Sequence, residues 1–366
     1  MATVTRGAAV VVVAASLAAG LAACGERNPG GGGERGRQES GFEVGLLLPD
    51  KQVARWESFD RPLMERRVRE LCGDCRLEAV NAQNDVAVQQ QQMDSMITRG
   101  VGAIILTAVD ATAIHSSVER AEEAGIPVVA YDRLAEGPVS AYVSFDNRQV
   151  GREQGEALLR ALDERGGDQI VMVNGSPTDP NTALFREGAL SVLEGEVDIL
   201  REYDTPGWIS RFAYGNVTAA VADLGPEEIH GVLAANDSVA AGTVAALRAA
   251  RIDPLPPVTG QDAELAALQR IVAGTQYQTV YKPYEDEARP AAELAVALTR
   301  GEPLDDIARD RVATDGADDI PAVLATPVSV TVDDIEDTVV RDGLVTIDQL
   351  CTRRFEDDCR RAGLLD

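Results

Sequence analysis

Polar side chains recur at one kind of place in this sequence, directly after short apolar runs. They are carboxylates, amides, one guanidinium and one ammonium, and they stand at Asp132-Arg133, Asp146-Asn147, Asp179 to Asn181, Asn236-Asp237, Asp262 and Lys282. Carboxylates and amides pair with donors or acceptors, and a guanidinium offers a fork of donors. This set matches adjacent hydroxyl groups, each of which both donates and accepts. The residues therefore predict a site for a polyhydroxylated small molecule.

The two tryptophans of the chain support the same interpretation. Trp56 in VARWESF and Trp208 in TPGWISRF both follow predicted strand ends. An indole packs flat against the C–H face of a sugar ring and excludes water from it. Ordinary core packing is the alternative for either residue, but their polar neighbours favour ligand contact.

The elements that must position these residues alternate regularly along the chain. Apolar runs such as 43–49, 102–109 and 126–132 are each followed by a segment with helical spacing of apolar residues. Such runs, with helices between them, are typical of parallel strands that are covered on both faces. About ten runs occur between residues 43 and 282, which exceeds one ordinary sheet in a chain of this length. We expect an α/β fold of two doubly wound parallel-sheet lobes joined by a hinge, with the polar residues in the cleft beyond the strand ends.

A fold of two lobes joined by a hinge also requires the chain to cross from one lobe to the other. We expect the chain to cross between lobes after about residue 147, near 282 and around 322. The first lobe is then 42–147 plus 283–322, and the second is 148–282 plus 323–366, including a tail that carries two cysteines. The acidic stretch 331–343 lacks the spacing of a calcium loop and predicts solvated surface.

The N-terminus predicts export. Residues 8–23 are apolar, follow Arg6 and are shorter than the ~20 residues of a membrane-spanning helix, so residues 1–23 have the pattern of a secretory signal. The sequence Leu21-Ala22-Ala23-Cys24 resembles the bacterial lipobox, in which the cysteine is acylated. An ordinary signal with an incidental cysteine is the alternative. We expect a lipid anchor at Cys24, a flexible tether over 24–41, and an extracytoplasmic protein attached to the cell membrane.

Charge limits the partners. The chain has a formal net charge of -26, which disfavours nucleic acid and direct adhesion to anionic lipid. Only Lys51 and Lys282 are lysines, although Lys and Arg together number 34. A lysine that persists among so many arginines suggests a place where a planar guanidinium would not fit.

Four cysteines remain after Cys24. They lie in LCGDC (Cys72 and Cys75) and in LCTRRFEDDC (Cys351 and Cys359). In an exported protein we expect disulfides, and local pairing is the simplest of three connectivities. A redox or metal role is the alternative, but neither histidine of the chain lies near a cysteine, and we expect no metal and no cofactor.

The motifs also resemble a known family. In order along the chain they are RW (55–56), AYDR (130–133), SFDNRQVG (144–151), GSPTDPNTALFREG (175–188), AAND (234–237), GQDA (260–263) and GTQYQTVYKP (274–283). This series, over residues 42–320, is similar to the D-xylose-binding proteins of ABC sugar importers, which are type I periplasmic binding proteins. The resemblance implies a monosaccharide ligand, most closely D-xylose, and delivery to a membrane permease driven by an ATPase. We expect a monomer.

The resemblance also implies the ligand-binding residues. Trp56 and Trp208 would cover opposite faces of the sugar ring, and the remaining residues would bind its hydroxyls: Arg55, Asp132, Arg133, Asp179, Asn181, Arg186, Asn236, Asp262 and Lys282. A plain salt-bridge role is the alternative for Arg186, and a solvated surface position is the alternative for Lys282. Pro180, the LCGDC motif and the cysteine-bearing tail depart from the family pattern. Ribose, arabinose, galactose and glucose therefore remain open as ligands.

Other function classes fit less well. The sequence contains no G-x-G-x-x-G after a strand and no phosphate-binding G-x-x-x-x-G-K-[ST]. A glycosidase could use a pair of carboxylates, but we expect no enzyme. A DNA-binding repressor would need a headpiece where this chain has a signal and a tether. A sensor that presents bound sugar to a membrane receptor stays open, because it would use the same binding site.

Overall fold

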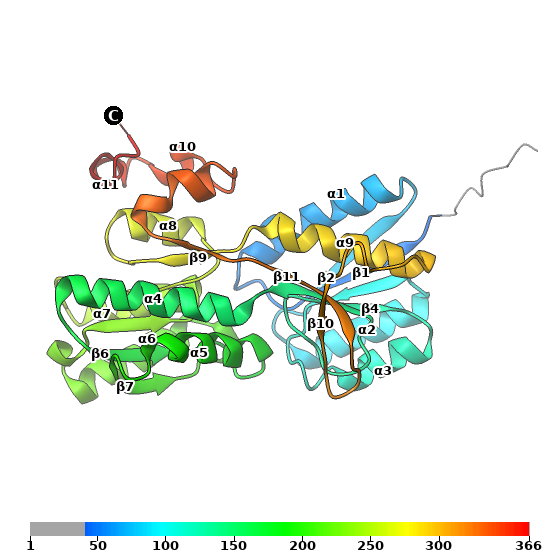
Figure 1. Cartoon of the computed structure of the whole chain (residues 1–366), viewed down its shortest axis with the longest axis horizontal. Helices are drawn as coiled ribbons and strands as arrows, with labels where there is room; N and C mark the ends of the chain where they lie inside the picture. The colour runs from blue at the N-terminus through cyan, green and yellow to red at the C-terminus, as the bar shows by residue number, and fades with distance from the viewer. Residues whose placement is uncertain (1–40, 366) are drawn as a thin grey trace, which may run out of the picture. The chain divides into compact units, whose positions relative to one another are not determined.

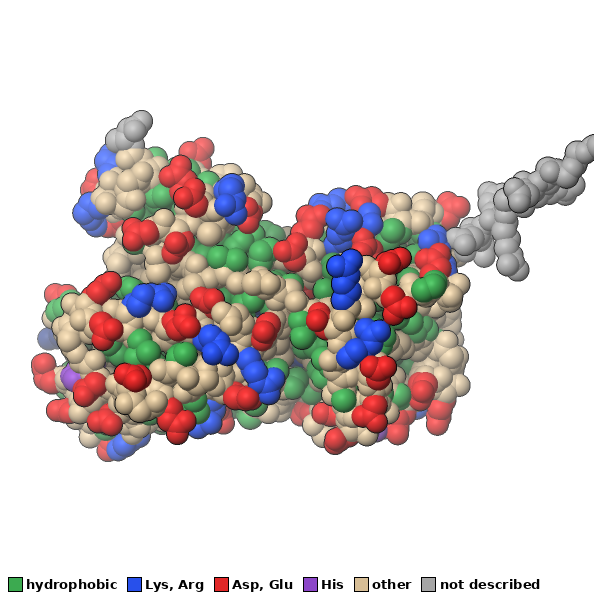
Figure 2. Space-filling model, viewed as in Figure 1, with side chains coloured by type: hydrophobic (Ala, Val, Ile, Leu, Met, Phe, Trp, Pro, Cys, Tyr) green, Lys and Arg blue, Asp and Glu red, His purple; other side chains and the backbone are tan. Residues whose placement is uncertain are grey.

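Residues 41–365 are described by a computed structural model, and they fold around two main sheets that are flanked by helices (Figure 1). The predicted signal over 1–23, the lipidation site Cys24 and all of the predicted tether except Gly41 lie outside the described residues. On the face shown in Figure 2, acidic and basic side chains are interspersed.

The first sheet has seven strands in the order β10-β11-β5-β4-β3-β1-β2. Neighbouring strands are parallel except β10 and β11, which are antiparallel. The strands are β1 (Glu43–Leu48), β2 (Arg76–Asn81), β3 (Ala103–Leu106), β4 (Val128–Tyr131), β5 (Ala141–Phe145), β10 (Asp310–Val312) and β11 (Ile320–Ala325).

Helices cover both faces of this sheet. Because side chains alternate along a strand, Leu46 packs in one cluster with Met64 and Leu294, whereas Leu47 packs in another with Met93. The first cluster involves α1 and α9, and the second involves α2 and α3. The helices are α1 (Arg61–Leu71), α2 (Val86–Arg99), α3 (His115–Glu123) and α9 (Tyr284–Arg300).

The second sheet has three parallel strands in the order β7-β6-β8. Ile170 and Met172 of its central strand pack with α4 and α5, and Val171 and Val173 pack in the cluster that contains α6 and α7. The elements are α4 (Asn147–Arg165), β6 (Gln169–Val173), α5 (Pro180–Leu193), β7 (Asp198–Tyr203), α6 (Ser210–Leu224), the turn η3 (Pro226–Glu228), β8 (Gly231–Ala234) and α7 (Asp237–Ala249). The expected α/β class with two doubly wound halves is confirmed.

One expected strand is shorter than its apolar run. Residues 256–262 form only a single parallel bridge, from Val258 to Val232. Pro256 and Pro257 have no N–H to donate to a ladder, which limits pairing at this point. Strands β9 (Thr279–Tyr281) and β12 (Val328–Val330) form an antiparallel pair beside this bridge.

The chain passes between the two halves at three places. These are the links from β5 to α4, from β9 to α9 and from β11 to β12. The predicted third boundary at residue 322 falls inside β11, which pairs with β5 over residues 322–325. The assignment of two binding lobes itself stays a prediction.

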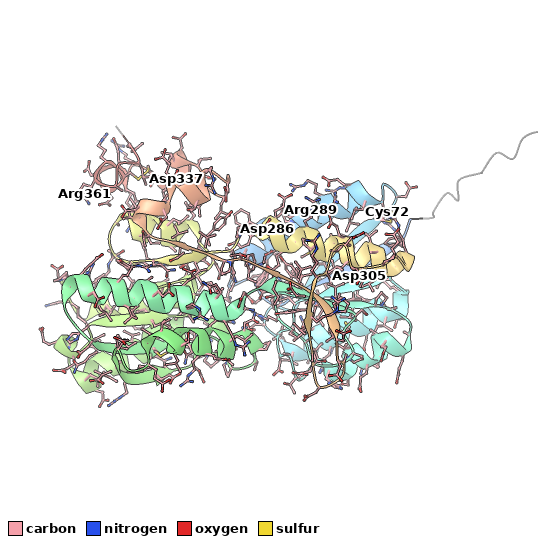
Figure 3. All side chains as sticks on the ribbon, viewed as in Figure 1. Cys72, Asp286, Arg289, Asp305, Asp337 and Arg361 are labelled. Atoms are coloured by element: carbon pink, nitrogen blue, oxygen red, sulfur yellow. A yellow bond between two sulfur atoms is a disulfide. The ribbon has the colours of Figure 1, made fainter. Side chains whose placement is uncertain are left out.

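The C-terminal segment, residues 331–365, packs on α8 (Leu265–Val272) and lies above it in Figures 1 and 3. The expectation of solvated surface over 331–343 is wrong for Ile335 and Val339, which are fully buried against Leu268 and its neighbours. Their acidic neighbours, such as Asp337, are exposed. The short elements of this segment are η4 (Val332–Asp334), η5 (Glu336–Val340), α10 (Ile347–Leu350) and α11 (Glu356–Arg361).

Disulfides close two local loops. Cys72 is bonded to Cys75 and Cys351 to Cys359, the simplest of the three connectivities. Cys72 and Cys75 pack against Val68 of α1, whereas Cys359 lies in the apolar cluster of the C-terminal segment. Each bond therefore holds a short segment against a helix.

Removing the C-terminal disulfide should destabilise the fold more than removing the other one. The Cys351–Cys359 loop spans eight residues, for which the chain-entropy relation gives about 2.5 kcal/mol, against about 1.5–2 kcal/mol for a loop of three to four residues. Urea unfolding of the Cys351→Ala/Cys359→Ala and Cys72→Ala/Cys75→Ala variants measures both losses. A C-terminal variant as stable as the parent would contradict this expectation.

Candidate functional site

A small cavity lies at the carboxyl ends of strands from both sheets. The space between atoms there, including the part that is open to solvent, is about 280 Å³. Ten of the eleven predicted ligand-binding residues line it, and they are Arg55, Trp56, Asp132, Arg133, Asp179, Asn181, Trp208, Asn236, Asp262 and Lys282. The loops that carry them follow β1, β4, β6, β7, β8, the bridge at Val258 and β9.

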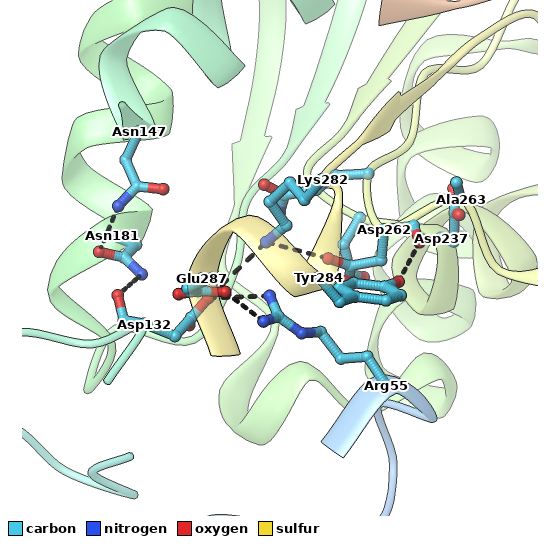
Figure 4. Close-up of polar contacts among 12 residues, drawn as sticks. Arg55, Asp132, Asn147, Asn181, Asp237, Asp262, Ala263, Lys282, Tyr284 and Glu287 are labelled. Carbon is cyan, nitrogen blue, oxygen red and sulfur yellow. Dashed lines mark hydrogen bonds and ion pairs between the residues drawn. The ribbon is translucent and has the colours of Figure 1, made fainter. Parts of the chain in front are cut away.

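Arg55 is a buried hub of ion pairs beside the cavity. It precedes the helical turn η1 (Trp56–Asp60), and its Nε and Nη2 atoms each donate to Asp60 at 2.9 Å. Nη1 donates to Oδ1 of Asp132 at 3.0 Å, and Nη2 also pairs with Glu287 of α9 (Figure 4). Burial lowers the pKa of Arg55, but Asp60 and Glu287 outweigh burial and raise the pKa above its usual value. Arg55 therefore carries a permanent positive charge.

Lys282 connects carboxylates from the two halves. Its Nζ lies 3.0 Å from Oδ1 of Asp262 and 3.8 Å from Oδ1 of Asp132. Asp132 follows β4 of the first sheet, whereas Asp262 precedes α8. Lys282 is only 4 % exposed, so the alternative of a solvated surface lysine is wrong.

Asp179 organises the opposite side of the cavity. As the N-cap of α5, its Oδ1 accepts from the backbone N–H of Asn181 at 2.9 Å. Its Oδ2 accepts from the indole N–H of Trp208 at 3.1 Å and lies 2.7 Å from Nε of Arg133. One carboxylate thus orients both an aromatic ring and a guanidinium.

Amide side chains complete the lining. Asn147 donates to Oδ1 of Asn181 at 2.9 Å, and Asn181 donates to the backbone oxygen of Asp132 at 2.9 Å (Figure 4). Asn236 caps α7 with its oxygen, and its amide nitrogen lies 3.4 Å from Oδ2 of Asp262. Asn181 therefore links Asp132 to the first turn of α5, and Asn236 links Asp262 to the N-terminus of α7.

Three residues of the cavity have left-handed backbone conformations. The φ angles are 60° at Asp132, 58° at Trp208 and 97° at Asp262. Such angles are unfavourable for residues other than glycine and persist where the surrounding structure holds them. The backbone N–H groups of Asp132 and Asp262 donate at 2.8 Å to Val143 and Val280, which provides that restraint.

Acidic groups outnumber basic groups around the cavity. Arg55, Arg133 and Lys282 face six buried carboxyls, which are Asp50, Asp60, Asp132, Asp179, Asp262 and Glu287. Buried carboxylates that lack a counter-charge take up protons instead. Because the carboxyls outnumber the cations, we expect raised pKa values for some of the six carboxyls.

The pKa shifts follow this balance. Burial would raise the pKa of Asp132, but Lys282, Arg55 and Arg133 outweigh burial and lower it. Burial raises the pKa of Asp179 despite the charge of Arg133. Burial likewise raises the pKa of Glu287 to about 8 against the opposing charge of Arg55. The lowered pKa keeps Asp132 ionised at neutral pH, whereas Glu287 takes up a proton more readily than an ordinary glutamate does.

Direct hydrogen bonds join the two halves around the cavity. Thr178, after β6, donates to the backbone oxygen of Val109 at 3.1 Å and accepts from the N–H of Ala111 at 3.3 Å. Asn84, after β2, donates to the backbone oxygen of Gly207 at 3.2 Å. The structure therefore shows the halves in contact across the cavity.

Arg186 is the predicted residue that the structure does not bring to the cavity. Its guanidinium pairs with Glu202, and its side chain is 45 % exposed. Asn181 and Phe185 are one helical turn apart on α5 and both line the cavity, whereas Arg186 is rotated about 100° from Phe185. The salt-bridge alternative is the one that the geometry favours.

Sequence reasoning missed three residues of the lining, Val53, Phe185 and Gln261. The i, i+4 spacing of Phe185 from Asn181 was a usable signal, as was the position of Gln261 beside Asp262. It also missed Asp60 and Glu287, which contact Arg55 behind the cavity. No local pattern marks Glu287, which is 232 residues from Arg55.

The arrangement defines a class of protein, an α/β protein in which strand ends from two sheets surround a polar cavity. A family model for the periplasmic binding protein domain matches residues 44–303. The D-xylose-binding periplasmic protein of Escherichia coli is 33% identical over 307 residues, which are 82% of this chain and 90% of that protein. The multiple sugar-binding periplasmic receptor ChvE of Rhizobium radiobacter is 28% identical, over 84% of this chain and 92% of the receptor.

Solved structures agree with the sequence relatives. An ABC transporter solute-binding protein from Clostridium phytofermentans, with bound β-D-glucose, has a TM-score of 0.78 and 28% identity. The match covers 84% of this chain and 99% of that protein. The chain therefore belongs to the type I periplasmic sugar-binding proteins of ABC importers. The relatives are solute-binding proteins, so the expectation that the chain is not an enzyme is confirmed.

This family membership also indicates an extracytoplasmic protein. Among residues 41–365, no helix is long and apolar enough to cross a membrane. Within the same residues, no group of three or more His, Cys, Asp or Glu is placed to hold a metal ion.

Stability should fall as pH rises from about 4.5 to 8. Burial raises the pKa to about 8 at Glu287 and Glu264 and to about 7 at Asp237, so in this window the folded chain retains protons that the unfolded chain releases. Glu287→Gln should make the decline shallower, as measured by thermal unfolding at several pH values. Exposed Glu122→Gln is the matched control. Equal slopes for Glu287→Gln and the parent would show that Glu287 ionises normally.

Proposed function

We propose that this protein captures a monosaccharide, D-xylose, in the cavity between its two halves. The observation that carries the proposal is the convergence of ten predicted polar and aromatic residues on one small cavity. Fixed carboxylates, amides and cations match the hydroxyls of a sugar, and the two indoles match its C–H faces. The 33% and 31% identities to D-xylose-binding periplasmic proteins support xylose in particular.

We propose hinged closure as the binding mechanism. The two lobes would be residues 42–147 with 283–322, extended to the end of β11, and the remaining chain from 148. Since cavity residues come from both, a ligand that contacts both lobes stabilises the closed arrangement over an open one. The three links between the halves are the places where the backbone can bend.

Delivery to a permease completes the proposal. The protein would act as a monomer, held at the cell membrane by acylation of Cys24 and free to move on the tether over 24–41. A permease with its ATPase would receive the sugar. Presentation of bound sugar to a membrane receptor is the second candidate, since one relative is named as a multiple sugar-binding periplasmic receptor.

Calorimetric titration of residues 41–366 with D-xylose, ribose, arabinose, galactose and glucose tests the ligand. We expect saturable heat with xylose and much weaker binding of glucose, because one added CH2OH group must be excluded by the shape of the cavity. Trp56→Ala and Asp262→Ala should abolish xylose binding.

Arg186→Ala is the matched control for this titration, since Arg186 lies outside the cavity and should leave the affinity unchanged. Preferential binding of glucose would transfer the assignment to a hexose, in line with the glucose-bound structural relatives. An absence of heat with every sugar would refute the proposed function.

Lys282→Arg should weaken xylose binding at least tenfold although the charge is conserved. Lys282 Nζ contacts Asp262 and lies 5.9 Å from the ring centroid of Phe145, in a position that is nearly inaccessible to solvent. A planar guanidinium needs more room and directs its donors differently. Titration, with circular dichroism to verify folding, measures the effect, and unchanged affinity would show that only the charge matters.

A further inference from the structure

Three polar atoms of the residues that line the cavity have no hydrogen-bond partner among the described residues, and one of them, Nε of Arg133, lies in an ion pair with Asp179. The other two have neither kind of partner there, and they are the indole nitrogen Nε1 of Trp56 and the amide oxygen Oε1 of Gln261. The two residues are 2 % and 3 % exposed, so bulk water does not satisfy these atoms. Most buried polar side-chain atoms in proteins are paired, and a buried donor or acceptor without a partner is costly.

Gln261 forms a hydrogen bond through its amide nitrogen but not, among the described residues, through its amide oxygen Oε1. The amide nitrogen of Gln261 donates to the backbone oxygen of Ala235 at 3.3 Å. The backbone is held as well, because the oxygen of Gln261 accepts from the N–H of Asp237 at 3.0 Å. The backbone and the amide nitrogen of this lining residue are therefore held, and its amide oxygen is left without a partner among the described residues.

Packing likewise restrains the indole of Trp56. Its ring meets the edge of Tyr131 at a centroid separation of 6.5 Å, and the guanidinium carbon of Arg55 lies 4.5 Å from the ring centroid. Trp208 differs in one respect, because its indole N–H already donates to Asp179. The two tryptophans of the cavity are thus alike as apolar surfaces and different as donors.

We infer that Trp56 and Gln261 determine which hydroxyl pattern the site accepts: Trp56 Nε1 donates to a ligand oxygen, and Gln261 Oε1 accepts from a ligand hydroxyl. This inference rests on the proposed function and adds contacts to it. Trp56 follows β1 of the first sheet and Gln261 follows the bridge at Val258 beside the second, so the two contacts come from different halves. A site that hydrogen-bonds a hydroxyl rejects the analogue that lacks it, because its own buried atom is then left unpaired.

The test combines variants with ligand analogues. The full-length protein, Trp56→Phe and Gln261→Met are each titrated with D-xylose and its 2-, 3- and 4-deoxy analogues. Phenylalanine keeps an aromatic surface without the N–H, and methionine keeps the approximate length of glutamine without the acceptor. Gln261→Leu replaces Gln261→Met if the latter does not fold.

For each of the two contacts, one deoxy analogue lacks the hydroxyl that makes it. We expect the parent protein to bind that analogue at least tenfold more weakly than xylose. In Gln261→Met, xylose and that analogue should bind within about twofold of each other, because the contact is already lost. In Trp56→Phe, xylose and the analogue that lacks the hydroxyl bound by Trp56 should likewise bind within about twofold of each other. Trp208→Phe is the comparison, and it should weaken xylose and every analogue by a similar factor, because its N–H is bound to Asp179.

The outcomes distinguish a failure of this inference from a failure of the proposed function. Equal weakening of all four ligands by Gln261→Met and Trp56→Phe would assign these residues a structural role and overturn this inference alone. Unchanged binding by both variants would overturn it as well. If the parent protein binds none of the sugars in the wider panel, the proposed function is refuted and this inference falls with it.

Discussion

The site is organised by buried charges that must be paired. Arg55, Lys282 and Arg133 lie in a region that excludes water, where an isolated charge is strongly unfavourable. Each cation contacts carboxylates from segments that are far apart in the chain, so satisfying one ion pair fixes the position of several loops. Asp132 shows this most directly, since it contacts Arg55 and lies near Lys282 while its backbone oxygen accepts from Asn181.

This pairing also explains how the cavity can bind a neutral, polar ligand. The carboxylates and cations are already held in place by one another, so their remaining lone pairs and N–H groups are oriented before a ligand arrives. A preorganised site loses less conformational entropy on binding than a flexible one. The left-handed backbone at Asp132 and Asp262 has the same consequence, because each side chain is directed by a strained but firmly hydrogen-bonded turn.

The surrounding scaffold supports these loops from behind. Apolar residues on alternate sides of each sheet pack against helices, which keeps the strand ends at fixed separations. The C-terminal segment adds support at α8, directly after the loop of Asp262 and Ala263, and Ala263 belongs to the same apolar cluster as Val339. That segment lies beyond the residues matched by the family model.

The sequence alone determined the class of the fold and most of the site. Apolar runs between helices indicate parallel strands, and the carboxyl ends of parallel strands meet in one cleft. Residues such as Asp132, Asp179 and Lys282 could therefore be placed together without coordinates.

Only the tertiary structure decided which atoms form hydrogen bonds and ion pairs. It placed Arg186 outside the cavity and Phe185 inside it, because adjacent residues of a helix point in different directions. It also brought Glu287 to Arg55, and it left the N–H of Trp56 without a partner among residues 41–365, whereas the N–H of Trp208 donates to Asp179. These contacts join segments that are distant in sequence, and their geometry comes from packing, which no local pattern encodes.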